Sequence, residues 1–535
     1  MFLVGAEASQ RTQAGLLDVA ERTYRAILAA QLRQAPQPQN QINIAVTYHQ
    51  LGQIAQARRQ LDEAEDWYRK SLTIKEELGN RPDAATTYHQ LGTVAHDRGR
   101  LDEAEDWYRK SLTICEELGN RTGAASTYHQ LGMVAQERGR LDEAEDWYRK
   151  SLTICEELGD RPGTATTYHQ LGIVAHDRGR LDEAEDWYHK SLTIKEELGN
   201  HPDAATTYHQ LGMLAHDRGR LNEAEDWYRK SLTTSQELGN RTDIASTYHQ
   251  LGMVAHDRGR LDEAEDWYHK SLTIKEELGN HPDAATTYHQ LGMVAHDRGR
   301  LDEAEDWYLK SLTTSEEFDN RPGTATTSHQ LGMVAQQRGR LDEAEDWYRK
   351  SLTIKEELGN HAGATSTYHQ LGMLAHNRGR LDEAEDWYHK SLTTSQELGN
   401  RTATATTSHQ LGMVAQQRGR LDEAEDWYRK SLTTGEELGD RPGTALTHAQ
   451  LGRLAAERGD TRRALAEAVR CVSLFDQIPH PSTGTGPTDL RHWTTELGTD
   501  VLAEVWREVT GNPLPDAVRI YATTPEQEDQ GDDDV

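Results

Sequence analysis

The sequence has few of the residues that build a large globular core or a covalent framework. Only 35% of its 535 residues are hydrophobic, three are phenylalanine and three are cysteine, and its mean hydropathy is -0.85. No apolar run approaches the roughly 18 residues that a membrane-spanning helix needs. So few cysteines exclude a disulfide-rich secreted scaffold. We therefore expect no membrane span, and free thiols in a reducing compartment.

An excess of positive charge is also missing. The formal net charge is -30, from 89 Asp and Glu against 59 Lys and Arg. A field of this sign repels phosphate backbones and anionic lipid surfaces. Residues 1–10 have neither a basic start nor a long apolar stretch, so we expect no signal peptide. These observations predict a cytoplasmic protein that binds neither nucleic acid nor membranes.

Sequence signatures of enzymes are missing as well. The chain has no Gly-x-x-x-x-Gly-Lys-Ser/Thr loop, no His-Glu-x-x-His, no Gly-x-Ser-x-Gly and no Cys-x-x-Cys. The acidic cluster at residues 102–106 resembles a catalytic carboxylate pair, but it recurs along the chain. That recurrence argues against a unique active site. We expect no catalytic activity, no cofactor and no metal ion.

What the chain does contain is one unit of forty residues repeated in tandem. Residues 171–210 and 251–290 differ at a single position, where Ile173 is replaced by Met253. A fixed period of this size predicts stacked units of secondary structure, each covering its neighbour, and not one globular core. Function is then expected on a surface built by repetition.

Each unit is predicted to form two antiparallel helices. In residues 80–119, Asn80 is a good cap for the first helix and Gly99 breaks it. Asp102 and Glu105 match a capping-box pattern at the start of the second helix. Gly119 ends that helix at a position where a left-handed residue is favoured.

The second helix is predicted to bury one stripe of side chains. The members of this stripe are Ala104, Tyr108, Ser111, Leu112 and Leu118. Trp107, which adjoins the stripe, is expected to be half-buried against the neighbouring repeat. Cys115 and Cys155 occupy a position where other copies have Lys, Ser or Gly, so we expect their thiols to be exposed.

These residues resemble the tetratricopeptide repeat. The pattern of that family is matched here by Tyr88, Leu91, Gly92, Ala95, Gly99, Ala104, Tyr108, Ser111 and Leu112. The forty-residue period is similar to the longer-repeat class of kinesin light chains and bacterial multi-repeat proteins. The resemblance implies an all-α fold, a right-handed α-solenoid of helix-turn-helix repeats.

The repeat divides the chain into five predicted segments. They are a degenerate N-terminal repeat or cap with a loop (residues 1–44), ten near-identical repeats (45–444), a degenerate eleventh repeat (445–484), a C-terminal capping helix (485–512) and an acidic disordered tail (513–535). The loop is expected at residues 34–43 and the capping helix at about residues 489–510.

The resemblance also implies a concave groove lined by the first helix of each repeat. Two histidine positions of the repeat, the fifth and the twelfth, then face or border this groove. The histidines expected to bind a peptide there are His89, His96, His129, His169, His176, His209, His216, His249, His256, His289, His296, His329, His369 and His409.

Three interpretations of these histidines are open. They are exposed residues copied along with the repeat, a ladder that hydrogen-bonds an extended peptide, or metal and catalytic groups. The third is the weakest, because His89 and His96 are separated by about 10 Å along a helix, too far to share one zinc ion. Free imidazoles titrate near ~6.5, so the groove is expected to gain positive charge as the pH falls from about 7.5 to 5.5.

The function that these observations favour is a non-enzymatic scaffold. It would hold a peptide or helix of a partner protein in the groove. The alternative is a sensor or regulatory array that acts with a separate effector, such as a bacterial signalling ATPase. The sequence does not identify the ligand.

Overall fold

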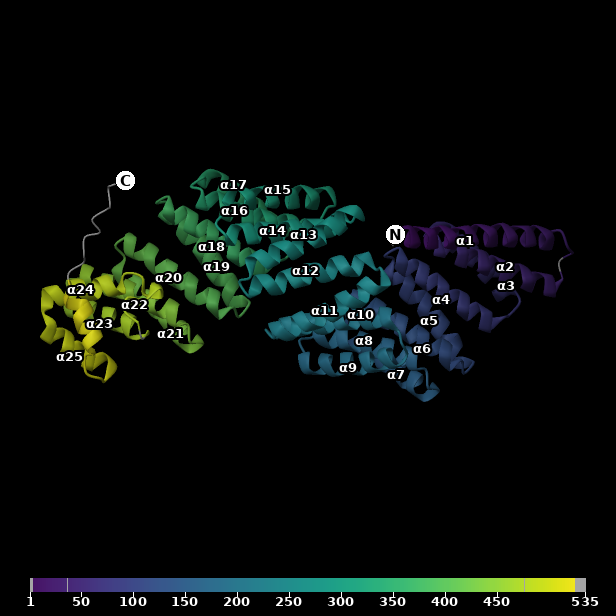
Figure 1. Cartoon of the computed structure of the whole chain (residues 1–535), viewed down its shortest axis with the longest axis horizontal. Helices are drawn as coiled ribbons and strands as arrows, with labels where there is room; N and C mark the ends of the chain where they lie inside the picture. Colours follow the sequence, from purple (N-terminus) through teal and green to yellow (C-terminus); the bar gives the residue numbers. More distant parts are fainter. Residues whose placement is uncertain (1–2, 36, 476, 525–535) are drawn as a thin grey trace. The chain divides into compact units, whose positions relative to one another are not determined.

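The computed structural model describes residues 3–35, 37–475 and 477–524 of the chain. In these ranges the regular structure consists of 26 α-helices and one short 3-10 helix (Figure 1). The helices form consecutive antiparallel pairs, and within residues 1–279 and within residues 280–535 each pair packs on the next. The predicted all-α solenoid of helix-turn-helix repeats is therefore confirmed. The chain divides into two compact units, residues 1–279 and residues 280–535.

The first helix of each pair is called an A helix here, and the second a B helix. The A helices are α2 (Pro38–Ala57), α4 (Arg81–Asp97), α6 (Arg121–Glu137), α8 (Arg161–Asp177), α10 (His201–Asp217), α12 (Arg241–Asp257), α14 (His281–Asp297), α16 (Arg321–Gln337), α18 (His361–Asn377), α20 (Arg401–Gln417) and α22 (Arg441–Glu457). The B helices are α3 (Leu61–Glu77), α5 (Leu101–Glu117), α7 (Leu141–Leu158), α9 (Leu181–Glu197), α11 (Leu221–Leu238), α13 (Leu261–Glu277), α15 (Leu301–Glu317), α17 (Leu341–Glu357), α19 (Leu381–Glu397), α21 (Leu421–Leu438) and α23 (Thr461–Ser473). The remaining elements are α1 (Leu3–Leu32), η1 (Pro481–Thr483), α24 (Gly486–Leu497), α25 (Thr499–Thr510) and α26 (Asp516–Thr523).

Three of the four predicted features of the helix ends are confirmed. The Asn80 side chain accepts a hydrogen bond from the Asp83 backbone N–H, which caps α4 as predicted. Gly99 and Gly119 have φ values of +70° and +67° and end the two helices. The predicted capping box is wrong, because α5 already begins at Leu101 and Asp102 lies inside its first turn. There Asp102 pairs with Arg138 of the next repeat.

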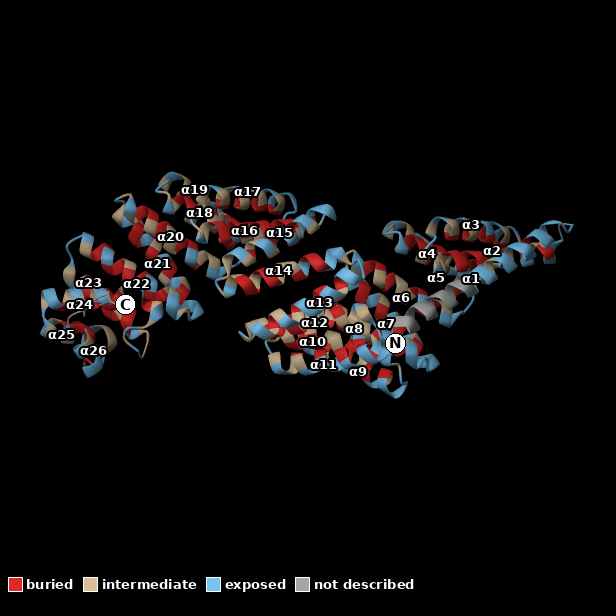
Figure 2. Cartoon of the chain, turned by 45° about the horizontal axis from the view of Figure 1, so that its top comes forward, coloured by how far each residue is buried: buried red, intermediate tan, exposed pale blue. Residues whose placement is uncertain are grey.

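The buried stripe of the B helix is confirmed in four of its five predicted members. Ala104, Tyr108 and Ser111 are at most 1% exposed, and Leu112 is 7% exposed. The buried Ser111 hydroxyl donates to the Ala85 carbonyl of the paired A helix, so it is not left without a partner. Leu118 is 46% exposed, because it follows the last residue of α5. Figure 2 shows buried residues running along the facing sides of the helix pairs.

A tyrosine ring on each B helix from α3 to α21 fills the space beside a glycine on its A helix. A Cβ atom placed on Gly92 would lie 2.6 Å from Cε1 of Tyr108, which is closer than atoms of these types can approach. The same contact joins Gly52 to Tyr68 and recurs through Gly412 and Tyr428. All of these rings are fully buried. The glycine is therefore required by the close approach of a rigid side chain.

A network of ion pairs links successive repeats within each of the two compact units. Glu65 of α3 is paired with Arg69 of the same helix. It also pairs with Arg98 and Arg100, which lie between α4 and α5 of the next repeat. The three nitrogen–oxygen distances are 2.7, 2.8 and 2.5 Å. The Glu65 side chain is 13% exposed, so these charges are only partly screened by water. The arrangement recurs at Glu105. It connects neighbouring repeats on the side of the B helices.

The tryptophan beside the buried tyrosine also spans two repeats. Trp107 is half-buried, stacks on Tyr88 with ring centroids 5.6 Å apart, and donates from Nε1 to Glu103. It packs against the apolar clusters of its own repeat and of the preceding one. The predicted half-burial against a neighbour is confirmed. The Lys110 ammonium lies 4.2 Å from the centre of the Trp107 ring.

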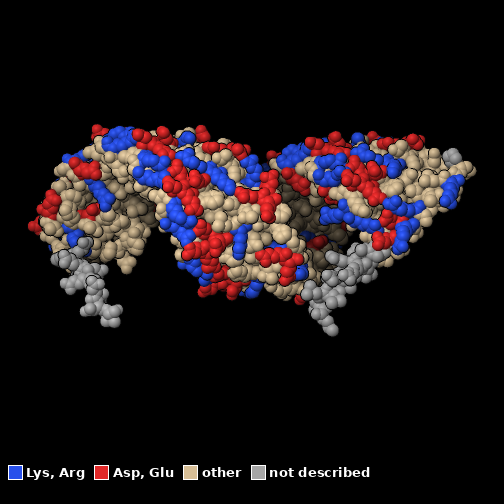
Figure 3. Space-filling model, turned by 90° about the horizontal axis from the view of Figure 1, so that it is seen from above, with Lys and Arg blue, Asp and Glu red and all other residues tan. Residues whose placement is uncertain are grey.

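The surface carries both signs of charge. Figure 3 shows acidic and basic side chains interspersed over the visible face of the molecule. Within the ranges that the structure describes, none of the helices combines the length and the apolarity needed to cross a bilayer.

The two ends of the array differ from the prediction. α2 begins at Pro38, inside the segment predicted to be a loop. The predicted single capping helix is two helices, α24 and α25, because Gly498 adopts a φ of +94° between them. α26 lies in the segment predicted to be a disordered tail, whose residues 525–535 are outside the described ranges. The five-segment division itself stays a prediction.

The C-terminal helices cover the last repeat. Leu490 of α24 and Leu502 and Trp506 of α25 pack with Leu465 and Val469 of α23 in one apolar cluster. α23 would otherwise present this face to water, because no further repeat follows it to cover it. These short helices therefore take the role of the capping helix.

We predict that Gly212→Ala lowers the free energy of unfolding by about 1–3 kcal/mol. The new methyl group would lie 2.6 Å from the buried ring of Tyr228, and this overlap outweighs the better helix propensity of alanine. Urea denaturation followed by far-UV circular dichroism measures the change.

Gly452→Ala is the matched control. It occupies the same place in the degenerate eleventh repeat, where the nearest atom to a new Cβ is the Ala464 carbonyl oxygen at 3.3 Å. This variant is expected to match or exceed the wild type in stability. Equal losses in both variants would show that the tyrosine contact does not set the requirement for glycine.

Candidate functional site

Cavities open between A helices of successive repeats. These helices contact one another, as α10 and α12 do, and the B helix between them forms the floor. Five such cavities lie at equivalent places, two in residues 1–279 and three in residues 280–535. Their volumes are about 510, 330, 340, 230 and 180 Å³. They form a periodic set and not a single active-site cleft.

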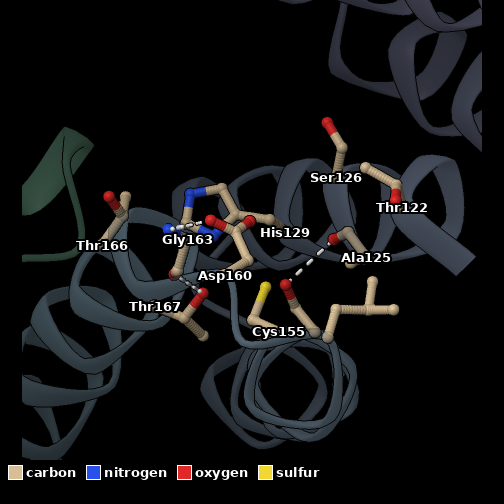
Figure 4. Close-up of a pocket in the computed structure, with 11 residues that line it drawn as sticks. Thr122, Ala125, Ser126, His129, Cys155, Asp160, Gly163, Thr166 and Thr167 are labelled. Atoms are coloured by element: carbon tan, nitrogen blue, oxygen red, sulfur yellow. Dashed lines mark hydrogen bonds between the residues drawn. The ribbon is translucent and has the colours of Figure 1, made fainter.

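The largest cavity shows how the set is built. Its walls include His129 of α6, Ser151 and Cys155 of α7, and Asp160 and Thr167 at the start of α8. In Figure 4 the Cys155 side chain points from α7 into the space between the side chains of α6 and α8. The Ser151 hydroxyl donates to the Ala125 carbonyl, and that of Thr167 to the Gly163 carbonyl. The lining is polar but contains only one ionisable carboxylate.

The fifth-position histidines are half-buried and held on two sides. The rings of His89, His129, His169, His209, His249, His289, His329, His369 and His409 each pack against the buried tyrosine of the same repeat, with centroids 5.3–5.7 Å apart. Nδ1 of His89 lies 3.1 Å from Oγ1 of Thr127 in the next repeat, and the same contact joins His329 to Thr367. The imidazole therefore connects neighbouring repeats and leaves only one edge toward the cavity.

Burial keeps these imidazoles neutral. It lowers the pKa of His89, His129 and His209 from 6.5 to about 4. At His169 the charge of Lys195 adds to the effect of burial, and the pKa falls to about 3. The expectation that this part of the groove gains positive charge between about pH 7.5 and 5.5 is therefore wrong for the fifth position. The sequence pattern could not show it, because nothing in it reveals how far the next repeat covers the ring.

The twelfth-position histidines have a different environment. Nε2 of His96 lies 2.8 Å from Glu137 of the next repeat, and His176 and His216 make the same contact to Asp217 and Asp257 at 2.6 Å. His296 lies near Asp297 of its own helix, and His256 is also partnered. Five fifth-position histidines line cavities (His129, His209, His289, His369 and His409), and three twelfth-position histidines (His96, His176 and His216) contact a carboxylate of the next repeat.

One position that shapes the cavities was missed by sequence reasoning. We call it the slot, and its occupants are Lys75, Cys115, Cys155, Lys195, Ser235, Lys275, Ser315, Lys355, Ser395 and Gly435. Cys115 and Cys155 are free, as predicted, but each is only 4% exposed, so their predicted exposure is wrong. The slot follows Ser111 by one helical turn, and this spacing places it on the buried face. Its variable and often polar residues hid that signal.

The slot residue determines what fills the space between A helices. The five cavities occur where it is Cys155, Ser235, Ser315, Ser395 or Gly435. Where it is lysine, the side chain reaches the same place, and Nζ of Lys75 donates to Oγ1 of Thr87 at 2.7 Å. Burial lowers the pKa of Lys75 to about 8. A small residue in the slot leaves this space open in these five repeats, and lysine fills it in the repeat of Lys75.

The chemistry available at these cavities is hydrogen bonding. Neutral imidazole, hydroxyl, amide and thiol groups line them, and such groups suit the polar side chains and backbone of a peptide. Among the residues that the structure describes, no group of three His, Cys, Asp or Glu side chains could hold a metal ion.

We predict that acidification destabilises the array through the fifth-position histidines. Their pKa is about 6.5 in the unfolded chain and about 4 in the folded one, so the unfolded state binds more protons between these values. Stability is then lost as the pH falls from about 6.5 toward 4, by up to about 1.4 kcal/mol per pH unit for each histidine. Urea denaturation at a series of pH values measures the slope.

The combined variant His89→Gln, His129→Gln and His209→Gln is expected to flatten that slope, because glutamine does not titrate. His189→Gln, on the exposed side of α9, is the matched control and is expected to keep the wild-type slope. A triple variant that loses stability on acidification as steeply as the wild type would contradict the assignment.

Comparison with known proteins agrees with the repeat structure. None of the curated proteins matches the sequence. Three solved structures resemble parts of the fold: BtubC (BKLC) from P. vanneervenii (21% identity, 41% of this chain and 92% of that chain, TM-score 0.38), the apo form of the quorum sensor NprR from B. thuringiensis (13%, 68% and 99%, 0.47) and aspartyl phosphate phosphatase F from Bacillus subtilis (12%, 66% and 93%, 0.45). The family model of the tetratricopeptide repeat matches residues 43–117, 123–197, 168–237, 243–317, 283–357, 363–437 and 403–477. These matches cover most of the chain, which belongs to the tetratricopeptide repeat family.

Proposed function

We propose that this protein is a non-enzymatic scaffold that binds an extended segment of a partner protein across its A helices. The observation that carries the proposal is the series of equivalent cavities between successive A helices. A ligand that crosses several repeats meets the same wall chemistry at each step. Such a surface suits a chain of amino acids better than a compact small molecule.

The cavity walls support a peptide as the ligand. Thr286, His289 and Gln290 of α14 and Thr326 of α16 line one cavity, and their side chains supply both donors and acceptors. An extended peptide has unpaired backbone N–H and C=O groups that need such partners. The fifth-position histidines contribute as neutral hydrogen-bonding groups and not as charges, since burial lowers their pKa.

The ordered array favours binding without large rearrangement. The fifth-position imidazole is held by the tyrosine ring and by the threonine of the next repeat, so its orientation is set before a ligand arrives. A pre-organised surface loses less conformational entropy on binding than a flexible one. This is how a polar groove without a deep apolar pocket reaches a useful affinity.

A regulatory role with a separate effector remains the second proposal. The same groove would then bind a signal peptide or the effector itself. Identification of the bound segment distinguishes the two roles, because a scaffold and a sensor differ in partner and not in the chemistry of the groove.

We predict that Cys155→Lys weakens peptide binding at least about tenfold. Lysine is already the slot residue of four other repeats, so the fold should accept it, and its side chain would fill the largest cavity. Peptides are first selected on the full chain from a phage-displayed library of random dodecapeptides. Fluorescence anisotropy with the selected peptides then compares the dissociation constants.

His189→Arg is the control, because arginine stands at this exposed B-helix position in other repeats, as at Arg149 and Arg229. Its dissociation constant is expected to equal that of the wild type. Failure to select any peptide would overturn the proposed function. If the selected peptides bind Cys155→Lys as tightly as the wild type, the binding surface lies outside the cavities.

A further inference from the structure

The repeats with lysine in the slot show how a primary ammonium is held between two A helices. Nζ of Lys75 donates to Oγ1 of Thr87, and Nζ of Lys195 donates to Oγ1 of Thr207 at 2.9 Å. The carboxylates of Asp83 and Asp203 favour the charged form of these lysines, which burial disfavours. These two repeats therefore hold an internal ammonium beside a threonine and an aspartate, at a place that we call the cradle, whereas Lys355 donates to Thr367 in a repeat that has Gly363 in place of the aspartate.

One repeat has the same cradle without the lysine. Ser235 occupies its slot, and Asp243 and Thr247 stand at the positions of the aspartate and the threonine, eight and twelve residues further along. The Thr247 hydroxyl donates to the Asp243 carbonyl and lies 3.4 Å from Nδ1 of His209. In the repeat with Lys195, the Thr207 hydroxyl makes the equivalent hydrogen bond to the Asp203 carbonyl, with an oxygen–oxygen distance of 3.0 Å. The difference lies in the slot, where the ammonium is absent.

Two polar groups at this place have no ammonium of a slot lysine beside them. Ser235 is 0% exposed, and its Oγ has no hydrogen-bond partner, which is rare for a buried hydroxyl. Asp243 is hydrogen-bonded by Nδ2 of Asn240 at 2.7 Å but faces no lysine in its own slot. Burial raises the pKa of Asp243, so the carboxylate gains from a nearby positive charge.

A cavity gives access to this place from the A-helix side. It measures about 180 Å³ and is lined by Thr206, His209 and Gln210 of α10, Ser231 of α11 and Asp243 of α12. Ser235 lies one turn beyond Ser231 on the same face of α11, and the equivalent residues Ser315 and Gly435 line their own cavities. Asp243 is therefore reachable from the A-helix side, whereas Ser235 and Thr247 are fully buried next to this cavity and do not line it.

We propose that this cavity binds a primary ammonium group, supplied by a lysine side chain of the partner peptide. The Asp243 carboxylate lines the cavity and offers the first acceptor to the ammonium, and the buried Thr247 Oγ1 and Ser235 Oγ are the further acceptors of the cradle. The long aliphatic stem of lysine suits a narrow opening between helices. The net charge of -30 attracts a basic segment toward the array. The inference rests on the proposed function, since it names the chemistry of one position of the bound peptide.

The test compares the wild type with two variants whose new residues occur naturally at equivalent positions of this chain. Ser235→Lys supplies the ammonium from within, as Lys75 and Lys195 do, and closes the site. Asp243→Gly removes the carboxylate, and glycine already occupies this position at Gly123 and Gly163. Ser315→Lys, which fills a cavity with Gly323 in place of the aspartate, is the matched control.

The first measurement is a calorimetric titration of each full chain with n-butylammonium chloride, with n-butanol as the neutral probe. We expect n-butylammonium to bind the wild type, with affinity at least about tenfold lower for Ser235→Lys and at least about threefold lower for Asp243→Gly. Ser315→Lys is expected to match the wild type. Equal binding to the wild type and to Ser235→Lys would overturn the ammonium site.

The second measurement is the selection of random dodecapeptides on the wild type and on Ser235→Lys. We expect lysine to be enriched in peptides selected on the wild type and this enrichment to fall on Ser235→Lys. Peptides that bind without a lysine preference would overturn the inference and leave the proposed function standing. Binding of n-butylammonium that is lost in Ser235→Lys, without selection of any peptide, would support the ammonium site and overturn the peptide as its source.

Discussion

The packing of the repeats depends on one contact, which the buried tyrosine of each B helix from α3 to α21 makes with a glycine of the paired A helix. Tyr108 fills the space that Gly92 leaves open, and so it brings the two helices of a repeat together. The same ring supports His89, whose Nδ1 reaches Thr127 of the next repeat. One buried side chain therefore joins the packing within a repeat to the register between repeats. The tyrosine that fills the core of the repeat therefore also orients the imidazole at the groove.

This dependence explains why the inner surface is polar but not charged. The histidines that line the cavities have lost most of their water to the tyrosine behind them and the next A helix beside them. Burial lowers the pKa of His129 and His209 to about 4, so near neutral pH these imidazoles offer hydrogen bonds and not charge. Charge enters the cavities through other positions, namely the slot lysines and the aspartates near the A-helix start. These positions vary between repeats, so they can distinguish one part of a ligand from another.

The sequence predicted the repeat well and its edges less well. Helix pairing, the buried positions of Tyr108 and Ser111 and the half-burial of Trp107 followed from periodicity, because the same spacing recurs in every copy. The start of α5 was predicted too late. Aspartate is a common capping residue, but Asp102 lies inside the first turn and pairs with Arg138. The C-terminal helix was predicted as one element, because its apolar spacing continues through Gly498 while the backbone turns there.

By itself, the sequence determined the all-α fold and the pairing of helices within each forty-residue unit, because the same apolar spacing and turn glycines recur in every near-identical copy. Only the tertiary structure decided which of those residues are open to a ligand. Burial of the slot and neutrality of the fifth-position histidines both result from how closely the next A helix approaches. The distance between successive A helices depends on the packing of two repeats, so it cannot be read from the sequence of one repeat.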